Sequence, residues 1–292
     1  MDARLDSPAA EAVTAWRSVV RLVAGMPTSD GAGVRLTRVI GSPALPDLDP
    51  FLMLDEFGSE SASDYIAGFP DHPHRGFETV TYMLAGRMRH RDNQGNSGLL
   101  LPGGAQWMTA GRGIVHSEMP EQEHGLMRGF QLWVNLPARD KMTAPRYQDI
   151  DPERIPEVAL PGGATVRVVA GRVGGAEGPV GGVATDPVYL DILLEPGGRF
   201  AQRLPAGHTA FAYVYEGEAV IGAPGNGRSV GKSRLAVLSE GDGFAVASGQ
   251  GARLILVAGR PLKEPVAKYG PFVMNTPDEI RQAIRDFQAG RF

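Results

Sequence analysis

Three histidines and one glutamate occur in two short motifs whose spacing can direct them to a common point. The first motif is His72-Pro73-His74 and the second is His116-Ser117-Glu118. In a β-strand, residues i and i+2 point to the same face, so each motif presents two potential ligands on one side. Imidazole nitrogens and a carboxylate are typical ligands of a divalent transition metal. If both strands face the inside of one barrel, the sequence predicts a metal centre with coordination positions left open.

The remaining histidines and a nearby glutamate are the alternatives. Glu78 is a rival ligand because it has the same strand parity as the first motif, although the chain must bend to bring it within reach. His90 and His124 lie in charged, glycine-flanked segments, which favours surface loops. His208 lies in the other half of the chain, so we expect it to take no part in the site.

Short alternating segments must position these residues. The 39 glycines and 23 prolines make up about a fifth of the 292 residues, against an average of about 12%. Between these turn-forming residues, segments such as FETVTYML, GIVHSEM and FQLWVN alternate apolar and polar residues, which is the period of a half-buried strand. We therefore expect an all-β chain with many short antiparallel strands.

One clear helix is predicted near the C-terminus. The run Thr276-Pro277-Asp278-Glu279 has the pattern of an N-cap, a proline in the first turn and early acidic residues. Ile280, Ile284 and Phe287 then form an apolar stripe, and Gly290 is a typical stop. We expect a packing helix without chemistry of its own.

The two halves of the chain are faint copies of each other. The segment YMLAG ends at Gly86 and the similar segment YVYEG ends at Gly217, and later glycines repeat at matching spacings. Aligning these glycines places His72 on Arg203, His74 on Pro205, His116 on Leu254 and Glu118 on Leu256. The second copy is therefore expected to fold without the four ligands, which favours a functional role for them in the first copy.

The predicted organisation has three parts. Residues 1–17 are expected to form a flexible N-terminal extension, residues 18–140 a metal-binding barrel, and residues 141–292 a second barrel without ligands that ends in the helix. The stretch 136–158 contains four prolines and many charges, which is typical of a crossing between two domains.

Composition excludes several classes of site. The chain has no cysteine, which removes disulfides, cysteine-bound zinc, iron–sulfur clusters and thiol nucleophiles. A net charge of −4 gives no general attraction to nucleic acid or anionic lipid. The first residues lack the apolar core of a secretory signal, and no apolar run approaches the ~20 residues of a membrane span. We expect a cytoplasmic protein without direct contact to nucleic acid or membrane.

Long segments of the sequence resemble the pirin family of the cupin superfamily. The segments are FPDHPHRGFETVTYMLAG at 69–86, QWMTAGRGIVHSEMP at 106–120, MPTSDGAGVRLTRVIG at 26–41, LDEFG at 54–58, GFQLWVNLP at 129–137 and NTPDEIRQAI at 275–284. The resemblance implies two antiparallel cupin (jelly-roll) barrels, of which only the N-terminal one binds a metal. The implied ligands are His72, His74, His116 and Glu118, which favours Glu118 over Glu78. The implied metal is Fe(2+), with Mn, Cu, Ni, Co or Zn as alternatives.

The same resemblance implies an activity. Several members of the family cleave the flavonol quercetin with O₂, so we expect a quercetin 2,3-dioxygenase in which Glu118 both binds the metal and accepts the flavonol hydroxyl proton. Apolar and aromatic residues should line the pocket, and the candidates are Phe51, Met53, Phe57, Phe69, Trp107 and Trp133. The main alternative is a non-enzymatic, metal-binding regulator of a transcription factor or a metabolic enzyme. A cupin isomerase acting on a sugar is a weaker alternative.

Overall fold

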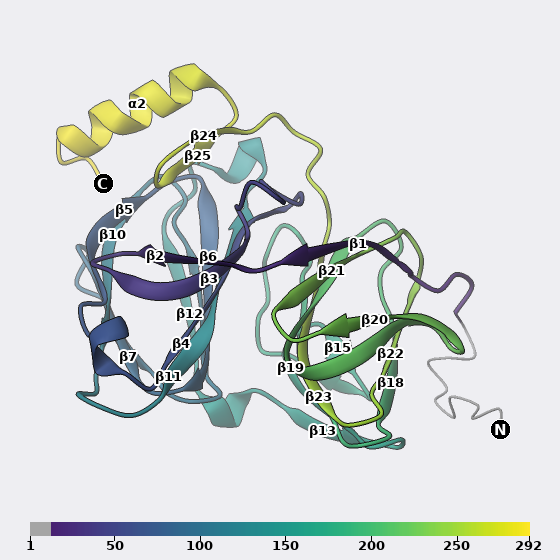
Figure 1. Ribbon diagram of the computed structural model, residues 1–292. Helices are drawn as coiled ribbons and strands as arrows, with labels where there is room; N and C mark the ends of the chain where they lie inside the picture. The colour runs from purple at the N-terminus through teal and green to yellow at the C-terminus, as the bar shows by residue number, and fades with distance from the viewer. Residues whose placement is uncertain (1–12) are drawn as a thin grey trace. The chain divides into compact units, whose positions relative to one another are not determined.

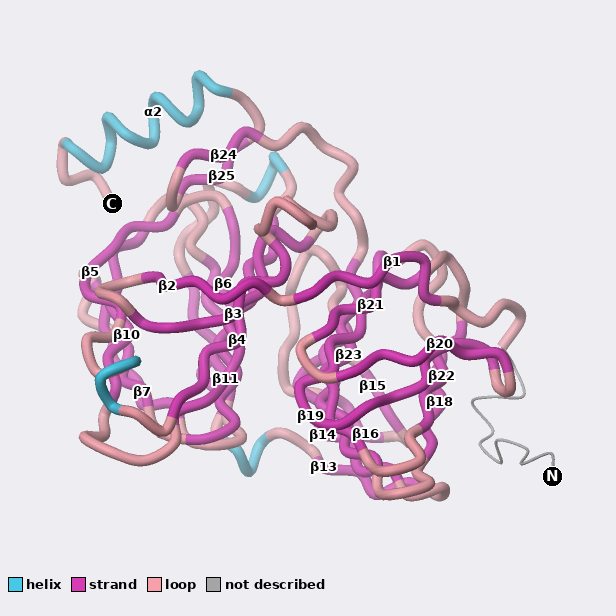
Figure 2. Tube along the Cα trace, in the orientation of Figure 1, coloured by secondary structure: helices cyan, strands magenta, loops and turns pink. Residues whose placement is uncertain are grey.

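The protein folds into two compact units built almost entirely of antiparallel strands. The computed structural model describes residues 13–292, and strands dominate it throughout (Figures 1 and 2). The first unit comprises Met26–Arg154 with Leu262–Phe292, and the second comprises Ile155–Pro261 with the described residues up to Gly25. Within residues 13–292, no helix combines the length and the apolar composition that crossing a bilayer demands. The all-β prediction with a C-terminal helix is confirmed.

The first unit contains two main sheets. Its strands are β2 (Met26–Asp30), β3 (Val34–Ile40), β4 (Phe51–Ser59), β5 (Phe69–His74), β6 (Phe77–Ala85), β7 (Met88–Asp92), β8 (Ser97–Leu100), β9 (Ala105–Thr109), β10 (Ile114–Pro120), β11 (Met127–Asn135), β12 (Arg146–Ile150), β24 (Ala267–Tyr269) and β25 (Phe272–Met274). Its helices are α2 (Pro277–Gln288) and the 3-10 turns η1 (Ala62–Asp64), η2 (Ala138–Asp140) and η3 (Pro152–Arg154). A seven-stranded sheet has the order β12-β9-β6-β11-β4-β3-β2, and a four-stranded sheet has the order β5-β10-β7-β8.

The second unit has one large branched sheet. Its strands are β1 (Val19–Ala24), β13 (Glu157–Leu160), β14 (Ala164–Ala170), β15 (Arg172–Val173), β16 (Ala176–Glu177), β17 (Val188–Leu194), β18 (Arg199–Arg203), β19 (Thr209–Ala223), β20 (Asn226–Gly231), β21 (Arg234–Leu238), β22 (Gly243–Ala247) and β23 (Ala252–Gly259). The main path is β1-β21-β19-β23-β17-β14-β13, and β18, β20 and β22 branch from it through the long strand β19. The expected antiparallel strands build both units, but the hydrogen-bonded ladders of the described strands do not close into complete barrels in either unit.

Strand pairing shows that the two units repeat one pattern. In the first unit β6 pairs with β9 and β11, and β10 pairs with β5 and β7. In the second unit β19 pairs with β21 and β23, and β22 pairs with β18 and β19. The long strand β19 therefore corresponds to β6 and β7 together, and β22 is the counterpart of β10.

This pairing corrects the alignment made from glycine spacing, which matched the β10 segment to β23. The spacing was misleading because turn glycines recur after almost every strand, whereas hydrogen-bond register identifies one partner for each residue. The register places His72 on Gln202, His74 on Leu204, His116 on Phe244 and Glu118 on Val246. Leu204, Phe244 and Val246 belong to the buried apolar core of the second unit. The conclusion that the second copy folds without the ligands therefore stands on a corrected alignment.

The ends of the units differ from the predicted domain boundaries. β1, which we expected to begin the first barrel, pairs with β21 in the second unit. β12 extends the first unit to Arg154 because it pairs with the free edge of β9. The last segment, residues 262–292, belongs to the first unit and not to the second. An unpaired sheet edge can accept a strand from any part of the chain, so sequence proximity does not decide which unit receives it.

The predicted flexible extension falls partly outside the described residues, which begin at residue 13. Thr14 and Ala15, however, are held in place, because their backbone N–H groups donate to Asp242 at 3.0 and 2.8 Å. Arg17 is buried, and its guanidinium donates to the carbonyls of Ser239 and Pro205. A flexible extension is therefore wrong for residues 14–17.

The C-terminal helix begins as predicted, with a reciprocal capping box. The Thr276 Oγ1 accepts from the backbone N–H of Glu279, whose carboxylate accepts from the Thr276 N–H at 2.8 Å. The helix packs on the β24–β25 hairpin, where its Ile280 is buried beside Phe272. Asp286 then forms a 2.7 Å ion pair with Arg75, whose side chain is 4% exposed. Since Arg75 directly follows β5, this ion pair ties the helix to the strand that carries the first histidine motif.

Replacing Asp286 by Asn should destabilise the first unit by about 2 kcal/mol, because it leaves the buried Arg75 guanidinium without its anion. The hydrogen bond from Arg75 lowers the pKa of the Asp286 carboxyl. The contribution is therefore complete above pH ~4 and is lost as the pH falls through the lowered value. Urea unfolding of the variant and the wild type at pH 7 measures the difference. The control is Asp278→Asn on the same helix, whose ion pair with Arg281 is exposed and should contribute less than about 0.5 kcal/mol. Equal effects of the two substitutions would contradict this role of Arg75.

Candidate metal centre

Two paired strands bring the histidine motifs together. β5 and β10 are antiparallel neighbours, and His72 lies directly opposite His116. The register shifts between His116 and Glu118, so that Glu118 lies opposite Phe69. Burial alternates along β10, and both His116 and Glu118 belong to its buried face. The predicted i, i+2 arrangement on one face is therefore what the structure shows for the second motif.

The three imidazoles form a compact cluster. One ring nitrogen from each of His72, His74 and His116 lies within 4.8 Å of the others, and the ring centroids are 4.5–5.0 Å apart. The rings of His74 and His116 are buried, and within residues 13–292 none of their four nitrogens makes a hydrogen bond of good geometry. Buried polar atoms without partners are costly. A metal ion bound by one nitrogen of each ring would satisfy that atom, so the residues present fit a metal ligand set.

The protonation state of the cluster also suits a metal. Burial lowers the pKa of His74 and His116 well below the ordinary value, and the neighbouring imidazoles lower the pKa further. Both rings are therefore neutral near pH 7, which is the form that binds a metal. His72 places its Nδ1 2.8 Å from the Pro70 carbonyl oxygen. A proton on that Nδ1 leaves the Nε2 lone pair free for a ligand bond.

Glu118 lies in the same cavity but outside the compact group of ligand atoms. Its carboxylate accepts a hydrogen bond from the Thr81 hydroxyl at 2.9 Å and another from the Gln131 amide at 3.3 Å. These two side chains come from β6 and β11, so the opposite sheet holds the carboxylate in place. Coordination by Glu118 remains an expectation of the family resemblance.

The structure does not bring Glu78 to the cluster. β5 ends at His74, and a turn at Arg75 and Gly76 separates it from β6. The alternation of faces along β5 therefore does not predict which face Glu78 occupies on β6. The Glu78 carboxylate instead accepts a 2.6 Å hydrogen bond from the Thr109 hydroxyl. Burial raises its pKa. The rival ligand is therefore a buried structural carboxyl.

His90 corrects another expectation. It lies on β7, is 1% exposed and faces Glu118 directly across the strand pair. Its Nε2 lies 3.3 Å from Asp149, and its ring stacks on Tyr147 at 5.2 Å. The alternation in the run MRHRD could have predicted that His90 is buried, because the arginines on either side of it lie on the opposite face of the strand. His124, by contrast, is exposed as predicted.

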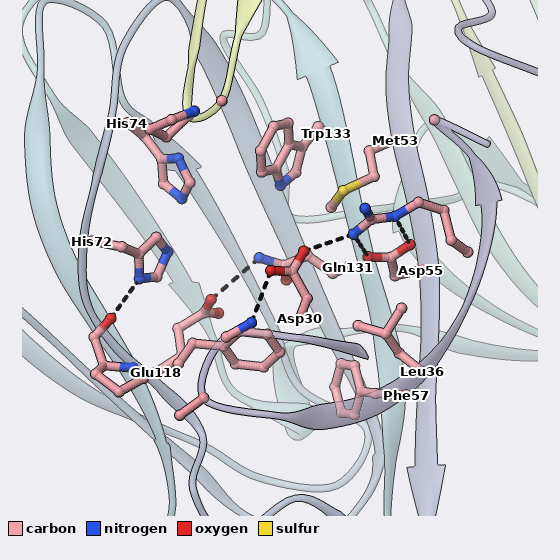
Figure 3. A pocket seen from close by; sticks show the side chains of 18 of the residues that line it. Asp30, Leu36, Met53, Asp55, Phe57, His72, His74, Glu118, Gln131 and Trp133 are labelled. Atoms are coloured by element: carbon pink, nitrogen blue, oxygen red, sulfur yellow. Dashed lines mark hydrogen bonds and ion pairs between the residues drawn. The ribbon is translucent and has the colours of Figure 1, made fainter. Parts of the chain in front are cut away.

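A cavity of about 740 Å³ opens beside the imidazole cluster. Figure 3 shows His72, His74 and Glu118 on one side and Asp55 on the opposite side, with Gln131 between them. Of the predicted apolar lining, Met53, Phe57, Phe69 and Trp133 are present. Phe51 and Trp107 do not line the cavity, because both are completely buried elsewhere in the seven-stranded sheet.

A continuous row of polar residues crosses the seven-stranded sheet beside this cavity. Cross-strand partners in this polar row are Arg38, Asp55, Gln131, Thr81, Gln106 and Asp149. The corresponding row of the second unit is Val168, Leu190, Leu256, Ala212, Ala236 and Leu22. Since the same sheet forms with apolar residues at every position, the polar row is not required by the fold. Its polarity is specific to the unit that contains the imidazole cluster.

An ion pair begins the polar row. The Arg38 guanidinium donates to both Asp55 carboxylate oxygens at 2.9 and 2.7 Å, and its Nη2 also donates to Asp30 at 2.7 Å. Asp55 is 2% exposed. A bidentate pair of this kind is rigid and directional. It gives the cavity a fixed polar wall opposite the imidazoles.

Comparison with known proteins points to one family. The model of the family described as pirin matches residues 33–134, and that of the pirin C-terminal cupin domain matches residues 189–292. A Pseudomonas aeruginosa protein provisionally named quercetin 2,3-dioxygenase is 55% identical over 95% of this chain and 99% of its own. Human pirin is 46% identical over 89% of this chain and 88% of its own. A structure of quercetin 2,3-dioxygenase from Acinetobacter baumannii has a TM-score of 0.87 and 35% identity, and covers 94% of this chain and 98% of its own.

His116→Ala and His74→Ala should each abolish stoichiometric metal binding while leaving the fold intact, because the second unit builds the same strands with apolar residues at these positions. Elemental analysis of the purified variants measures the metal, and circular dichroism checks the fold. His124→Ala is the matched control, since this histidine is exposed and should leave the metal content unchanged. Full metal occupancy in either ligand variant would contradict the assignment.

Proposed function

The chain belongs to the pirin family, and we propose that it is a metal-dependent dioxygenase that cleaves a flavonol such as quercetin with O₂. The observation that carries the proposal is the imidazole cluster beside a cavity with a polar row that the second unit lacks. The provisional name of the Pseudomonas aeruginosa relative and the Acinetobacter baumannii structure support the same reaction.

In this proposal His72, His74 and His116 hold one divalent metal, Fe(2+) in the first instance, and Glu118 is the fourth ligand. A redox-active metal there would bind the adjacent oxygens of a flavonol and make its reaction with O₂ accessible. The protein supplies apolar contacts for an aromatic ligand, because Met53 and Trp133 line the cavity that the cluster adjoins. Trp133 is also in edge contact with His74 at 5.3 Å, so a planar ligand on the indole lies close to the metal ligands.

Glu118 has a second role in the proposal, as the acceptor of the flavonol hydroxyl proton. Glu118 is 4% exposed, and its carboxylate accepts hydrogen bonds from Thr81 and Gln131. The hydrogen bonds orient the carboxylate, and to accept the proton as a general base it would have to loosen from the metal. Gln131 lies between Glu118 and Asp55 in Figure 3, so it can keep the carboxylate on the cavity side when the ligand enters.

The direct test is aerobic incubation of metal-loaded protein with quercetin. We expect loss of the flavonol absorbance together with O₂ uptake, and neither change with metal-free protein. If Fe(2+), Mn, Cu, Ni, Co and Zn all fail to support turnover, the dioxygenase proposal is wrong. A stoichiometric protein partner found with such an inactive protein would then favour the regulatory alternative.

Glu118→Gln should lower the turnover of quercetin by a factor of about 10² to 10⁴, because the amide cannot accept the proton. The measurement uses saturating metal, so that weaker coordination does not limit the rate. Glu123→Gln serves as the control, since Glu123 is exposed and lies only five residues away. Unchanged turnover in Glu118→Gln would exclude this residue as the base.

A further inference from the structure

Lys268 is an unpaired cation in the wall of the cavity. Among the described residues that line it, Arg38 and Lys268 are the arginine and lysine side chains. Arg38 is already held by Asp55 and Asp30. Within residues 13–292, the Lys268 ammonium has no carboxylate in ion-pair contact, and it donates one long bond of 3.4 Å to the Leu52 carbonyl. The charge of Lys268 therefore remains available to a ligand.

The position of Lys268 relative to the imidazoles limits the size of that ligand. Its Nζ lies 5.7 Å from the Trp133 ring, which lies 5.3 Å from the His74 ring. These two separations put the ammonium within about 11 Å of the His74 ring. One aromatic ring with a short side chain fits this span: one end faces the metal ligands, the ring contacts Trp133, and the other end faces Lys268.

The chemistry of Lys268 favours an anion at that end. The Lys268 side chain is exposed to solvent, but the protein atoms around its ammonium desolvate it and lower its pKa; Arg38 lowers the pKa further, whereas Asp47 and Asp55 raise it. An incoming carboxylate would stabilise the ammonium directly. A phenol has an ordinary pKa near 10 and stays largely neutral at pH 7, whereas a carboxylic acid is ionised there. A carboxylate is therefore the substituent that gains most from Lys268.

We infer that the site selects aromatic substrates that chelate the metal at one end and present a carboxylate to Lys268 at the other. The inference deepens the proposed function and rests on it, because it assumes that the cavity binds an aromatic, metal-chelating substrate. In the second unit, the residues equivalent to Arg38 and Asp55 are Val168 and Leu190, so that unit lacks the polar wall near Lys268.

The test compares caffeate, a catechol with a carboxylate, with its neutral amide, caffeamide. Isothermal titration of the metal-loaded protein at pH 7, without O₂, gives both dissociation constants. We expect the wild type to bind caffeate about tenfold more tightly than the amide, which is the scale of one charge-assisted hydrogen bond. Lys268→Met should remove the preference, and Lys268→Arg should retain most of it. Lys268 is exposed, so both variants should fold, and circular dichroism verifies this.

Equal binding of the two probes by the wild type, or a preference that survives in Lys268→Met, would overturn the inference. Absence of binding for both probes would overturn it as well. Quercetin carries no carboxylate, so its turnover reports on the dioxygenase proposal separately. A protein that prefers caffeate but does not oxidise quercetin would retain the Lys268 assignment and lose the dioxygenase.

Discussion

The free-energy cost of burying polar atoms is the constraint on which the site depends. Within residues 13–292, the four ring nitrogens of His74 and His116 are buried without a hydrogen bond of good geometry, and a row of polar side chains crosses the interior beside them. A core of this kind is less favourable than an apolar one unless every group finds a partner. Thr81 and Gln131 supply partners for Glu118, and Asp55 supplies one for Arg38. The imidazoles are left, and a metal ion bound by one nitrogen of each ring is the partner that suits them.

The second unit shows what the same architecture contains when this constraint is absent. Its equivalent row is made of valine, leucine and alanine, and its equivalents of His74 and His116 are Leu204 and Phe244. One chain therefore contains both a polar interior with an imidazole cluster and an apolar interior of the same topology. The contrast separates residues needed for strand pairing from residues needed for the site, which sequence similarity to other proteins alone cannot do.

Much of the site could be predicted from the sequence, and the errors have physical causes. The i, i+2 spacing identified His72, His74 and His116 because strand periodicity is local. The same reasoning was wrong for Glu78, because the turn at Gly76 interrupts the alternation of faces between the two strands. It was also wrong for His90: its charged neighbours suggested a surface loop, whereas they lie on the outer face of a strand whose inner face carries His90. The Arg38–Asp55 pair and Lys268 could not be found, because only the pairing of distant strands and the return of residues 262–292 bring them to the cavity.

The position of residues 262–292 in the first unit has a consequence for biosynthesis. Lys268, Gly270 and Pro271 line the cavity, yet they are translated after the whole second unit. During synthesis on the ribosome, the strands that carry the histidines can pair long before this wall exists. The cavity thus becomes complete only after the whole second unit has been translated, well after the strands that carry the histidines.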